Sequence, residues 1–355
     1  MSKTVLVVFW WRSFEHRISL DSAQTVINWL STEKYSIIPL GISKTGKCLI
    51  GDDALRILLQ ESEWYNGAWD FFIREQNENI CRNFIKCLET LPNPPDVIFP
   101  VIHGFHGEDG RLQGMFDLMW IPYVGSGVAG SAICMDKLLT KSILSKLDIP
   151  QLPYCGFTDF EWQQKKNDVI SEISALGFPI FIKPANLGSS IGISKVSFPE
   201  ELELSIEVAL RYDNRILAEK WLNHPREIEL AVLGNNDYLV SWAGEIIMQG
   251  DHDFYTYEAK YLDGPPTLHK IPADIPENTL IHLQEIVRLA CRAVNVEWLS
   301  RIDFFLDPET GSYYLNEINT IPDFTIDSMF PSLWISQGMT YSELLDELIT
   351  LALKK

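Results

Sequence analysis

The sequence lacks the cysteine patterns and the long apolar runs that mark zinc-binding, secreted or membrane proteins. Its 6 cysteines, at positions 48, 81, 87, 134, 155 and 291, include no Cys-x-x-Cys pair, and no histidine-rich segment accompanies them. This spacing argues against zinc and predicts buried free thiols in a reducing compartment. The first apolar run, residues 5–11, is too short for a membrane span and has no small-residue cleavage site, so we expect a cytoplasmic protein with no membrane partner.

Basic residues are also scarce. The chain has 29 Lys plus Arg against 48 Asp plus Glu, which gives a net charge of −19. Such a field repels a phosphate backbone, so we expect no nucleic-acid partner and interpret the acids as scattered surface charge. The remaining composition, 46% hydrophobic and 22% charged over 355 residues, is that of a soluble protein with about two or three domains.

No internal repeat or low-complexity tract is present. Short β-branched runs at residues 4–9, 35–42 and 96–102 alternate with helical spacing at 20–30 and 77–88, which predicts a mostly parallel α/β layer. We expect three α/β domains, at residues 1–124, 125–219 and 220–355, with clefts between them that suit a ligand.

The second and third units carry further element signals. In the second we expect a helix at 135–147 that Pro150 closes, strands at 179–183, 191–196 and 216–219, and a helix ending at 211. In the third we expect strands at 227–233 and 238–246, a helix at 278–293, strands at 299–305 and 312–317, and a helix at 341–353. The irregular stretch 249–272 has the length of a lid or a linker.

The segment from Gly41 to Lys47 nearly matches a phosphate-binding loop. However, Cys48 stands where a Ser or Thr hydroxyl should hold Mg²⁺, and no helix is predicted to follow. Because Thr45-Gly46 lies between two β-like runs, we interpret the segment as a hairpin turn.

The strongest functional signal is the pair of motifs Arg301-Ile-Asp303 and Glu317-Ile-Asn319. Residues two apart share one face of a strand, and a turn at 307–311 would place the two strands side by side. Clustered carboxylates are costly unless a positive charge joins them, and hard oxygen ligands of this kind suit Mg²⁺. A solvent-exposed hairpin face would explain a single carboxylate. The four polar residues of the two motifs together favour a metal site.

Two further segments point to nucleotide binding. After Lys183, a loop with Gly188, two serines and Gly192 could bind an anion through its backbone N–H groups, although plain turns use the same residues. The segment Glu219-Lys-Trp-Leu222 lies where the chain passes to the last unit, and could form an adenine slot or a simple connecting strand.

Together these motifs resemble the D-alanine–D-alanine ligase family of the ATP-grasp superfamily over nearly the whole chain. The resemblance also includes Glu15-His-Arg-Ile-Ser19, the stretch from His103 to Gly114, Met135-Asp-Lys137, Tyr257-Glu-Ala-Lys260-Tyr261 and Thr320. It implies an ATP-grasp fold with ATP between the central and C-terminal domains. The implied activity is the ATP-dependent ligation of two D-alanines through an acyl phosphate, for peptidoglycan precursor synthesis.

The resemblance also implies roles for individual residues at the ATP and metal sites. Phosphates would be held by Lys137 and Lys183, and adenine by Glu219, Lys220 and Leu222 with Phe254 packed on it. Glu227 would bind the ribose. Two Mg²⁺ ions, which Mn²⁺ can replace, would be held by Asp303, Glu317 and Asn319.

At the amino-acid sites, the resemblance implies that Glu15 and His103 orient the first D-alanine. Ser189 and Tyr261 would join Glu15 in a bridge that closes the lid, and Lys260 would reach the transferred phosphoryl group. Ser328 and the backbone of Met329 would receive the second carboxylate, and Arg301 would stabilise the oxyanion. The family also implies small amino-acid substrates and a homodimer.

Two departures from the family lie at the amino-acid sites. Trp10-Trp11 replaces a Gly-Gly pair, and Asp323 replaces the glycine of Asn-Thr-x-Pro-Gly, whose N–H helps to hold the oxyanion. They leave open a relative that joins D-alanine or another amino acid to a different amino or hydroxy acid. A nucleotide-binding protein without turnover is a third reading, which the presence of Arg301, Lys260 and Tyr261 disfavours.

Overall fold

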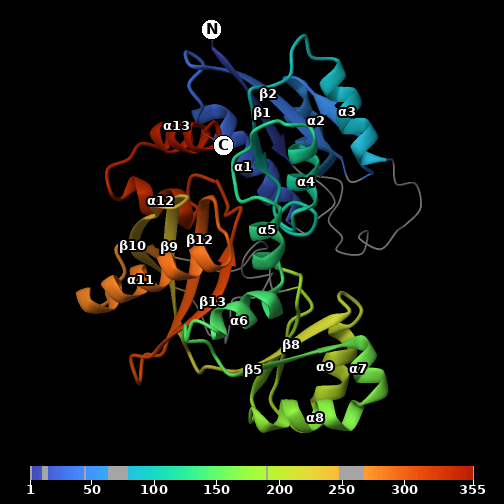
Figure 1. The fold of residues 1–355 in the computed structure, drawn as a ribbon, viewed down its shortest axis with the longest axis vertical. Coiled ribbons are helices and arrows are strands. Elements are labelled where there is room, and N and C mark those ends of the chain that lie inside the picture. The colour runs from blue at the N-terminus through green and yellow to red at the C-terminus, as the bar shows by residue number, and fades with distance from the viewer. Residues whose placement is uncertain are drawn as a thin grey trace.

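Three β-sheets form the frame of the molecule and follow one another along its long axis (Figure 1). The computed structural model describes residues 2–9, 15–43, 45–62, 79–188, 191–247 and 268–354. Within these ranges the sheets have the strand orders β3-β2-β1-β4, β5-β8-β6-β7 and β11-β10-β9-β12-β13. The predicted α/β class is confirmed.

The first sheet is mostly parallel, as predicted. Its central strand β1 (Lys3–Phe9) pairs in parallel with β2 (Tyr35–Ile42) and β4 (Val97–Val101). Residues 5–9 of β1 are completely buried, because helices cover both faces of the sheet. These helices are α1 (His16–Trp29), α2 (Asp53–Ser62), α3 (Ile80–Glu89) and α4 (Arg111–Leu118).

A hairpin joins β2 to β3 (Cys48–Ile50), where the sequence resembled a phosphate-binding loop. The two strands are antiparallel, and the Ser43 N–H donates to the Lys47 carbonyl across the turn at 2.8 Å. Gly46 has φ +88°, a conformation that glycine adopts without strain. Because a strand follows the turn, no helix N-terminus is placed to bind a phosphate, and the hairpin interpretation is confirmed.

The second sheet is antiparallel and lies at the end of the molecule farthest from the first (Figure 1). Its strands are β5 (Tyr154–Thr158), β6 (Ile180–Pro184), β7 (Ser194–Val196) and β8 (Arg215–Lys220). One face is covered by α7 (Asp159–Gln164), α8 (Lys166–Ala175) and α9 (Leu202–Ala209).

The helix predicted at 135–147 is observed over 137–145, and a separate helix that was not predicted precedes it. α5 (Val128–Met135) ends one residue before Asp136, and α6 (Lys137–Ser145) begins one residue after it. Asp136 has an extended backbone, and its side chain accepts a hydrogen bond from the Leu139 N–H. An Asp in this N-cap position starts a helix and cannot continue one, so Met135 belongs to the preceding helix.

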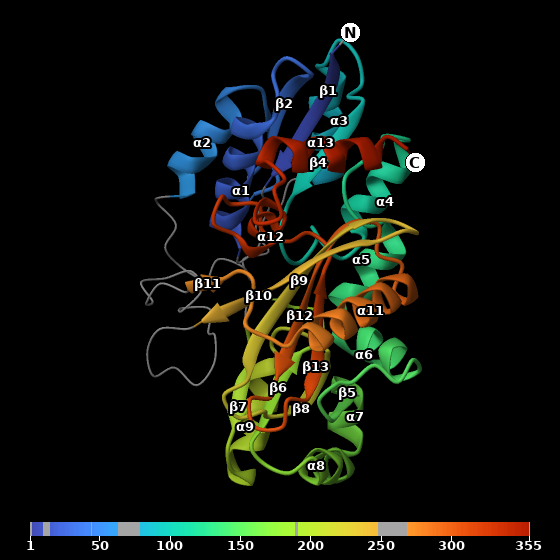
Figure 2. The ribbon, with the colours of Figure 1, turned by 90° about the vertical axis from the view of Figure 1, so that its left-hand side faces the viewer.

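The third sheet is also antiparallel. It contains β9 (Arg226–Gly234), β10 (Leu239–Ile247), β11 (Leu268–Lys270), β12 (Trp298–Leu306) and β13 (Tyr313–Asn319). The helix α11 (Glu277–Ala293) covers one face, and α12 (Met329–Ile335) lies on the other (Figure 2). The prediction of an irregular stretch at 249–272 is wrong for 268–270, which form β11; its residues 249–267 lie outside the described residues.

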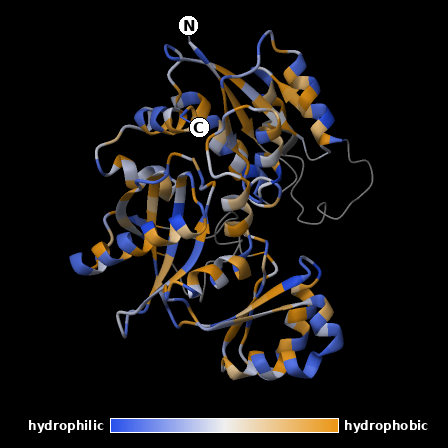
Figure 3. Cartoon of the chain, in the orientation of Figure 1, coloured by the Kyte–Doolittle hydropathy of each residue, from blue (hydrophilic) through white to orange (hydrophobic). Residues whose placement is uncertain are grey.

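The last helix, α13 (Tyr341–Ala352), returns to the first sheet and packs on α1 and β4 (Figure 2). One continuous core contains Val5 and Val7 of β1, Leu299 of β12 and Leu344 of α13. Hydrophobic residues are concentrated on strands and on inward helix faces (Figure 3). In the described part of the chain, no helix has the length and apolarity needed to cross a membrane.

All six cysteines are free thiols, as expected. Cys134, Cys155 and Cys291 are buried. The expectation of burial is wrong for the other three, because Cys48 and Cys87 are only partly buried and Cys81 is exposed on α3.

Candidate functional site

The predicted hairpin of β12 and β13 forms, and its polar residues face one side. Arg301 lies opposite Asn319, and Asp303 lies opposite Glu317. A β-bulge follows this pair, since Phe304 lies opposite Leu315 and leaves Asn316 without a partner in the ladder. As a result, the consecutive residues Asn316 and Glu317 both line the same cavity.

Asp303 is held by two neighbours on this face. The Arg301 guanidinium donates to both carboxylate oxygens at 2.8 Å, and Asn319 Nδ2 donates to Oδ2 at 3.0 Å. Arg301 also lies 3.0 Å from Glu229 of β9. Burial lowers the pKa of Arg301, but Asp303 and Glu229 raise it well above the usual range, so the guanidinium stays charged.

The donor set on this face suits a hard cation. In the described ranges, no three His, Cys, Asp or Glu side chains gather as a metal site. The hairpin instead offers two carboxylates directly opposite each other across β12 and β13, with an amide oxygen two residues along. Oxygen donors of this type fit Mg²⁺, which keeps several waters and shares its remaining positions with phosphate oxygens.

The lysines predicted to bind phosphates lie with this hairpin around one cavity. The cavity has a volume of about 810 Å³, and its lining includes Lys137, Lys183, Arg301, Asp303 and Glu317. Lys137 Nζ donates to the Leu187 carbonyl at 2.6 Å, at the start of the predicted anion-binding loop. Both predicted phosphate lysines and the two predicted metal carboxylates therefore line one cavity, while Asn319 contacts Asp303 and lines a smaller cavity beside it.

Beneath Lys183 lies a buried ion-pair network that the sequence did not predict. Lys183 Nζ is 2.7 Å from Glu219 Oε2, and Lys141 Nζ is 2.6 Å from Glu219 Oε1. Burial alone would raise the pKa of Glu219, but the two ammonium groups outweigh it and lower the pKa to about 2. Glu219 was expected at the adenine; its side chain is 2% exposed and pairs with the two lysines.

Of the other predicted adenine and ribose residues that the structure describes, Glu227 lines the large cavity at the start of β9. Lys220 ends β8, and its Nζ donates to the Gly177 carbonyl at 2.6 Å. Leu222 is partly buried two residues later, and neither Lys220 nor Leu222 is among the described residues that line the cavity.

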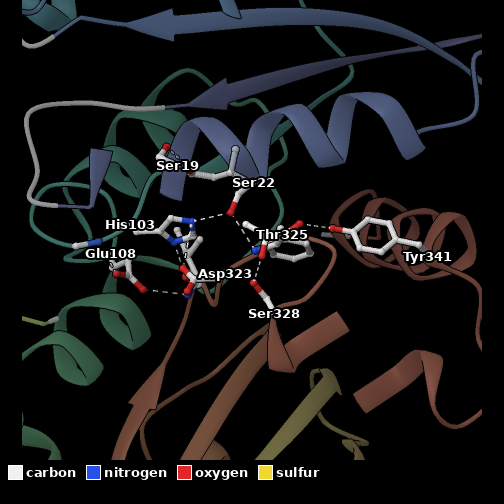
Figure 4. Close-up of polar contacts among 12 residues, drawn as sticks. Ser19, Ser22, His103, Glu108, Asp323, Thr325, Ser328 and Tyr341 are labelled. Carbon is white, nitrogen blue, oxygen red and sulfur yellow. Dashed lines mark hydrogen bonds and ion pairs between the residues drawn. The ribbon is translucent and has the colours of Figure 1, made fainter. Parts of the chain in front are cut away.

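His103 follows β4 and is held in a polar network (Figure 4). Its Nδ1 lies 3.0 Å from the Ile321 carbonyl and its Nε2 lies 3.3 Å from Ser22 Oγ. Ser22 of α1 also accepts a hydrogen bond from the Phe324 N–H at 3.1 Å. The network ties the first sheet to the loop that follows β13, and its member Ser22 was not predicted.

Glu108 is a second unpredicted residue of this region, although it lies within the motif from His103 to Gly114. Its carboxylate accepts hydrogen bonds from the Gly104 N–H at 2.5 Å and the Ile321 N–H at 3.2 Å. Burial and the negative charge of Glu15 raise the pKa of Glu108 well above its usual range, against the lowering effect of the two N–H groups. Through these two hydrogen bonds, Glu108 connects the loop after His103 to the segment that follows β13.

A smaller cavity of about 80 Å³ lies beside the large one. Its lining includes Glu15, His103, Glu108, Arg301 and Asp323. Asp323 and Arg301 line both cavities. Ser328 and Met329, the residues expected to receive the second carboxylate, line the large cavity, and Ser328 Oγ is 2.6 Å from Thr325 Oγ1.

Several predicted residues lie outside the described residues: Ser189, Phe254, Lys260 and Tyr261 of the site, and the departures Trp10 and Trp11. Their roles stay predictions from the family resemblance.

Comparison with protein families gives two matches. The model for the D-ala D-ala ligase N-terminus matches residues 4–126, and the model for the D-ala D-ala ligase C-terminus matches residues 143–350.

Individual relatives agree with these matches. The chain is 40% identical over 358 residues to the D-alanine–D-alanine ligase of Heliobacterium modesticaldum, covering 100% of this chain and 96% of that protein. It is 42% identical over 352 residues to the corresponding ligase of Caldicellulosiruptor bescii, covering 99% and 95%. Among solved structures, the VanG D-Ala:D-Ser ligase from Enterococcus faecalis has a TM-score of 0.81 at 31% identity, covering 99% of this chain and 100% of that one.

Proposed function

The chain belongs to the D-alanine–D-alanine ligase family, and we propose that it joins two D-alanines into D-alanyl-D-alanine at the expense of ATP, for peptidoglycan precursor synthesis. The observation that carries the proposal is the single cavity lined by Lys137, Lys183, Arg301, Asp303 and Glu317. It combines cations that suit phosphates with oxygen ligands that suit a divalent metal.

A carboxylate is a poor electrophile, so the first D-alanine must be activated as an acyl phosphate. We assign Lys137 and Lys183 to the phosphate oxygens, whose charge they would neutralise during in-line transfer. Asp303, Glu317 and Asn319 would hold two Mg²⁺ ions, which Mn²⁺ can replace. When bound, Mg²⁺ supplies further neutralisation of the phosphate charge.

The second step joins the two amino acids. The amine of the second D-alanine would attack the carbonyl carbon of the acyl phosphate, and Arg301 would stabilise the oxyanion that forms. The C–O bond to phosphate then breaks, so that inorganic phosphate leaves and the amine loses a proton. Arg301 lines both cavities and stays charged, which supports this role. Glu15 and His103 would orient the first amino acid from the small cavity, while Ser328 and the N–H of Met329 would bind the carboxylate of the second.

The acyl phosphate must be kept from water. We assign this role to the segment 249–272, with Lys260 on the transferred phosphoryl group and Tyr261 bridging to Ser189 and Glu15. For the nucleotide we keep the proposed slot of Glu219, Lys220 and Leu222, whose backbone groups would read the base edge, with Phe254 packed on the adenine and Glu227 on the ribose.

Four larger-scale proposals remain. The three domains at 1–124, 125–219 and 220–355 rest on the alternation of strands and helices, and the cytoplasmic location rests on the cysteines and the short first apolar run. The place of ATP between the last two domains and the homodimer rest on the family alone. Sedimentation of the purified protein would test the last of these.

A second candidate is a related ligase that joins D-alanine or another amino acid to a different amino or hydroxy acid. Asp323 favours it, because this carboxylate lies beside Arg301 and His103 where the family has a glycine. The similarity to the structure of a D-Ala:D-Ser ligase also supports this second candidate.

One assay separates the candidates. The purified protein is supplied with ATP, Mg²⁺ and pairs drawn from D-alanine, D-serine, D-lactate and a panel of L-amino acids, and both phosphate release and product mass are measured. We expect D-alanyl-D-alanine as the main product. Turnover only with a mixed pair would favour the second candidate, and no phosphate release with any pair would contradict both.

A further inference from the structure

Lys141 is a buried lysine that no proposed catalytic step uses. It belongs to α6, its side chain is 2% exposed, and its Nζ lies 2.6 Å from Glu219 Oε1. The other oxygen of Glu219 lies 2.7 Å from Lys183 Nζ. The three side chains come from three elements, α6, β8 and β6, and they form a row that ends at the large cavity.

The row carries one net positive charge. Each oxygen of Glu219 has its own ammonium partner, and the pKa of this carboxyl is lowered to about 2, so it is ionised at neutral pH. Burying an ion pair is costly, and a third buried charge adds to the cost. A neutral pair of Lys183 and Glu219 would be simpler if structure alone were required.

The two lysines differ in access. Lys183 lines the large cavity together with Lys137, whereas Lys141 is not among the described residues that line it. Lys137 and Lys141 are four residues apart in α6, so they lie on the same side of the helix. The helix thus presents one lysine to the cavity and another to the carboxylate behind it.

We propose that Lys141 is a positioning residue for ATP: it neutralises Glu219 from behind, so that Lys183 keeps a positive charge available to a phosphate. Without Lys141, the single carboxylate would cancel the charge of Lys183. The attraction between Lys183 and a phosphate would then be weaker, because the site is poorly screened and its net charge has fallen. Glu219 would also compete with the phosphate for the N–H donors of Lys183. This inference rests on the proposed function, because it assumes that ATP occupies the large cavity.

The test compares ATP binding by calorimetry with steady-state kinetics in wild type, Lys141→Met, Lys141→Arg, Glu219→Gln and the double variant Lys141→Met/Glu219→Gln. For Lys141→Met we expect Kd and KM for ATP to rise at least tenfold, with KM for D-alanine changed less than twofold. Lys141→Arg keeps the charge and should retain ATP affinity to within threefold of wild type. The double variant should recover most of the lost affinity, because it also leaves one net positive charge.

Two results would overturn the inference: unchanged ATP affinity in folded Lys141→Met, or a double variant that binds ATP no better than the single one. If Lys141→Met does not fold, the double variant is compared with the wild type. Both leave one net positive charge at Lys183, so their ATP affinities should agree within threefold; a tenfold loss in the double variant would contradict the proposal. Failure of the wild type itself to bind ATP would refute the proposed function instead.

Discussion

The carboxylate of Asp323 lies 3.6 Å from Nε2 of His103, at the boundary between the two cavities. The side chain of Asp323 is 30% exposed, whereas His103 is buried. Asp323 is not among the described residues with positive φ, so its backbone carries none of the strain that a replaced glycine can leave. The effect on substrate choice that we propose for Asp323 would then come from its charge, which would lie near the oxyanion assigned to Arg301.

Replacing Asp323 with glycine should raise kcat/KM for D-alanyl-D-alanine formation about tenfold, or roughly 1.4 kcal/mol, because a negative charge beside the oxyanion is removed. Asp323→Asn is the matched variant, since it removes the charge and keeps the size; it should give most of the same gain. The measurement is initial rate against D-alanine concentration at saturating ATP. An unchanged or lower value, with brisk wild-type turnover on D-alanine alone, would show that Asp323 is neutral.

Glu317→Gln should abolish phosphoryl transfer while leaving the fold intact. Removing a carboxylate from a metal site costs about 3 kcal/mol or more of transition-state stabilisation, which is over a hundredfold in rate. Glu309→Gln in the exposed turn of the same hairpin is the control, and should keep wild-type rates. Phosphate release and thermal unfolding are measured for both. Normal turnover of Glu317→Gln would remove this residue from the metal site.

The wild type should make little D-alanyl-D-lactate at neutral pH, and Tyr261→Phe should make more. In the family, a lid tyrosine distinguishes ligases that form a peptide bond from relatives that form an ester. Mass analysis of products from equal D-alanine and D-lactate checks this. The depsipeptide as the main wild-type product would contradict the role proposed for Tyr261.

Gly130→Ala should destabilise the protein by about 1–3 kcal/mol, because α5 packs tightly on the turn after α11. A Cβ at Gly130 would lie 2.3 Å from the carbonyl oxygen of Asn295, a backbone atom that cannot rotate away. The expected result is a Tm lowered by a few degrees.

Gly114→Ala is the matched control for this substitution. The nearest atom to its Cβ would be Val128 Cγ2 at an ordinary 3.7 Å, and alanine is favoured over glycine inside a helix by up to about 1 kcal/mol. This variant should therefore be as stable as the wild type or more so. Equal Tm values for the two variants would mean that the contact between Gly130 and Asn295 relaxes easily.

Sequence patterns predicted the elements whose signals are local. The hairpin of β12 and β13 is the clearest case, since alternation fixed which residues face the cavity and a short turn fixed the pairing. The helix α5 was not predicted, and its last residue, Met135, was assigned to the next helix although an Asp before Lys137 is a recognisable N-cap. The helix α12 was missed because Pro331 lies inside it.

The site was predicted less completely where its partners are far apart in the chain. Lys141 could be located on α6 from its spacing to Lys137, but its pairing with Glu219 depends on how α6 packs on β8. The contact of Ser22 with His103 likewise joins a helix and a loop that only the tertiary fold brings together. Local periodicity carries no information on such pairs.

The position of α13 also has a consequence for synthesis on the ribosome. One apolar face of the first sheet, with Val5 and Phe99, is completed by Leu344 and Leu348 of α13. At about 5–20 residues per second, translation leaves that face incompletely covered for roughly 20–70 s after β1 has been made. We therefore expect this apolar face of the nascent first sheet to stay exposed to solvent until the last helix docks on it.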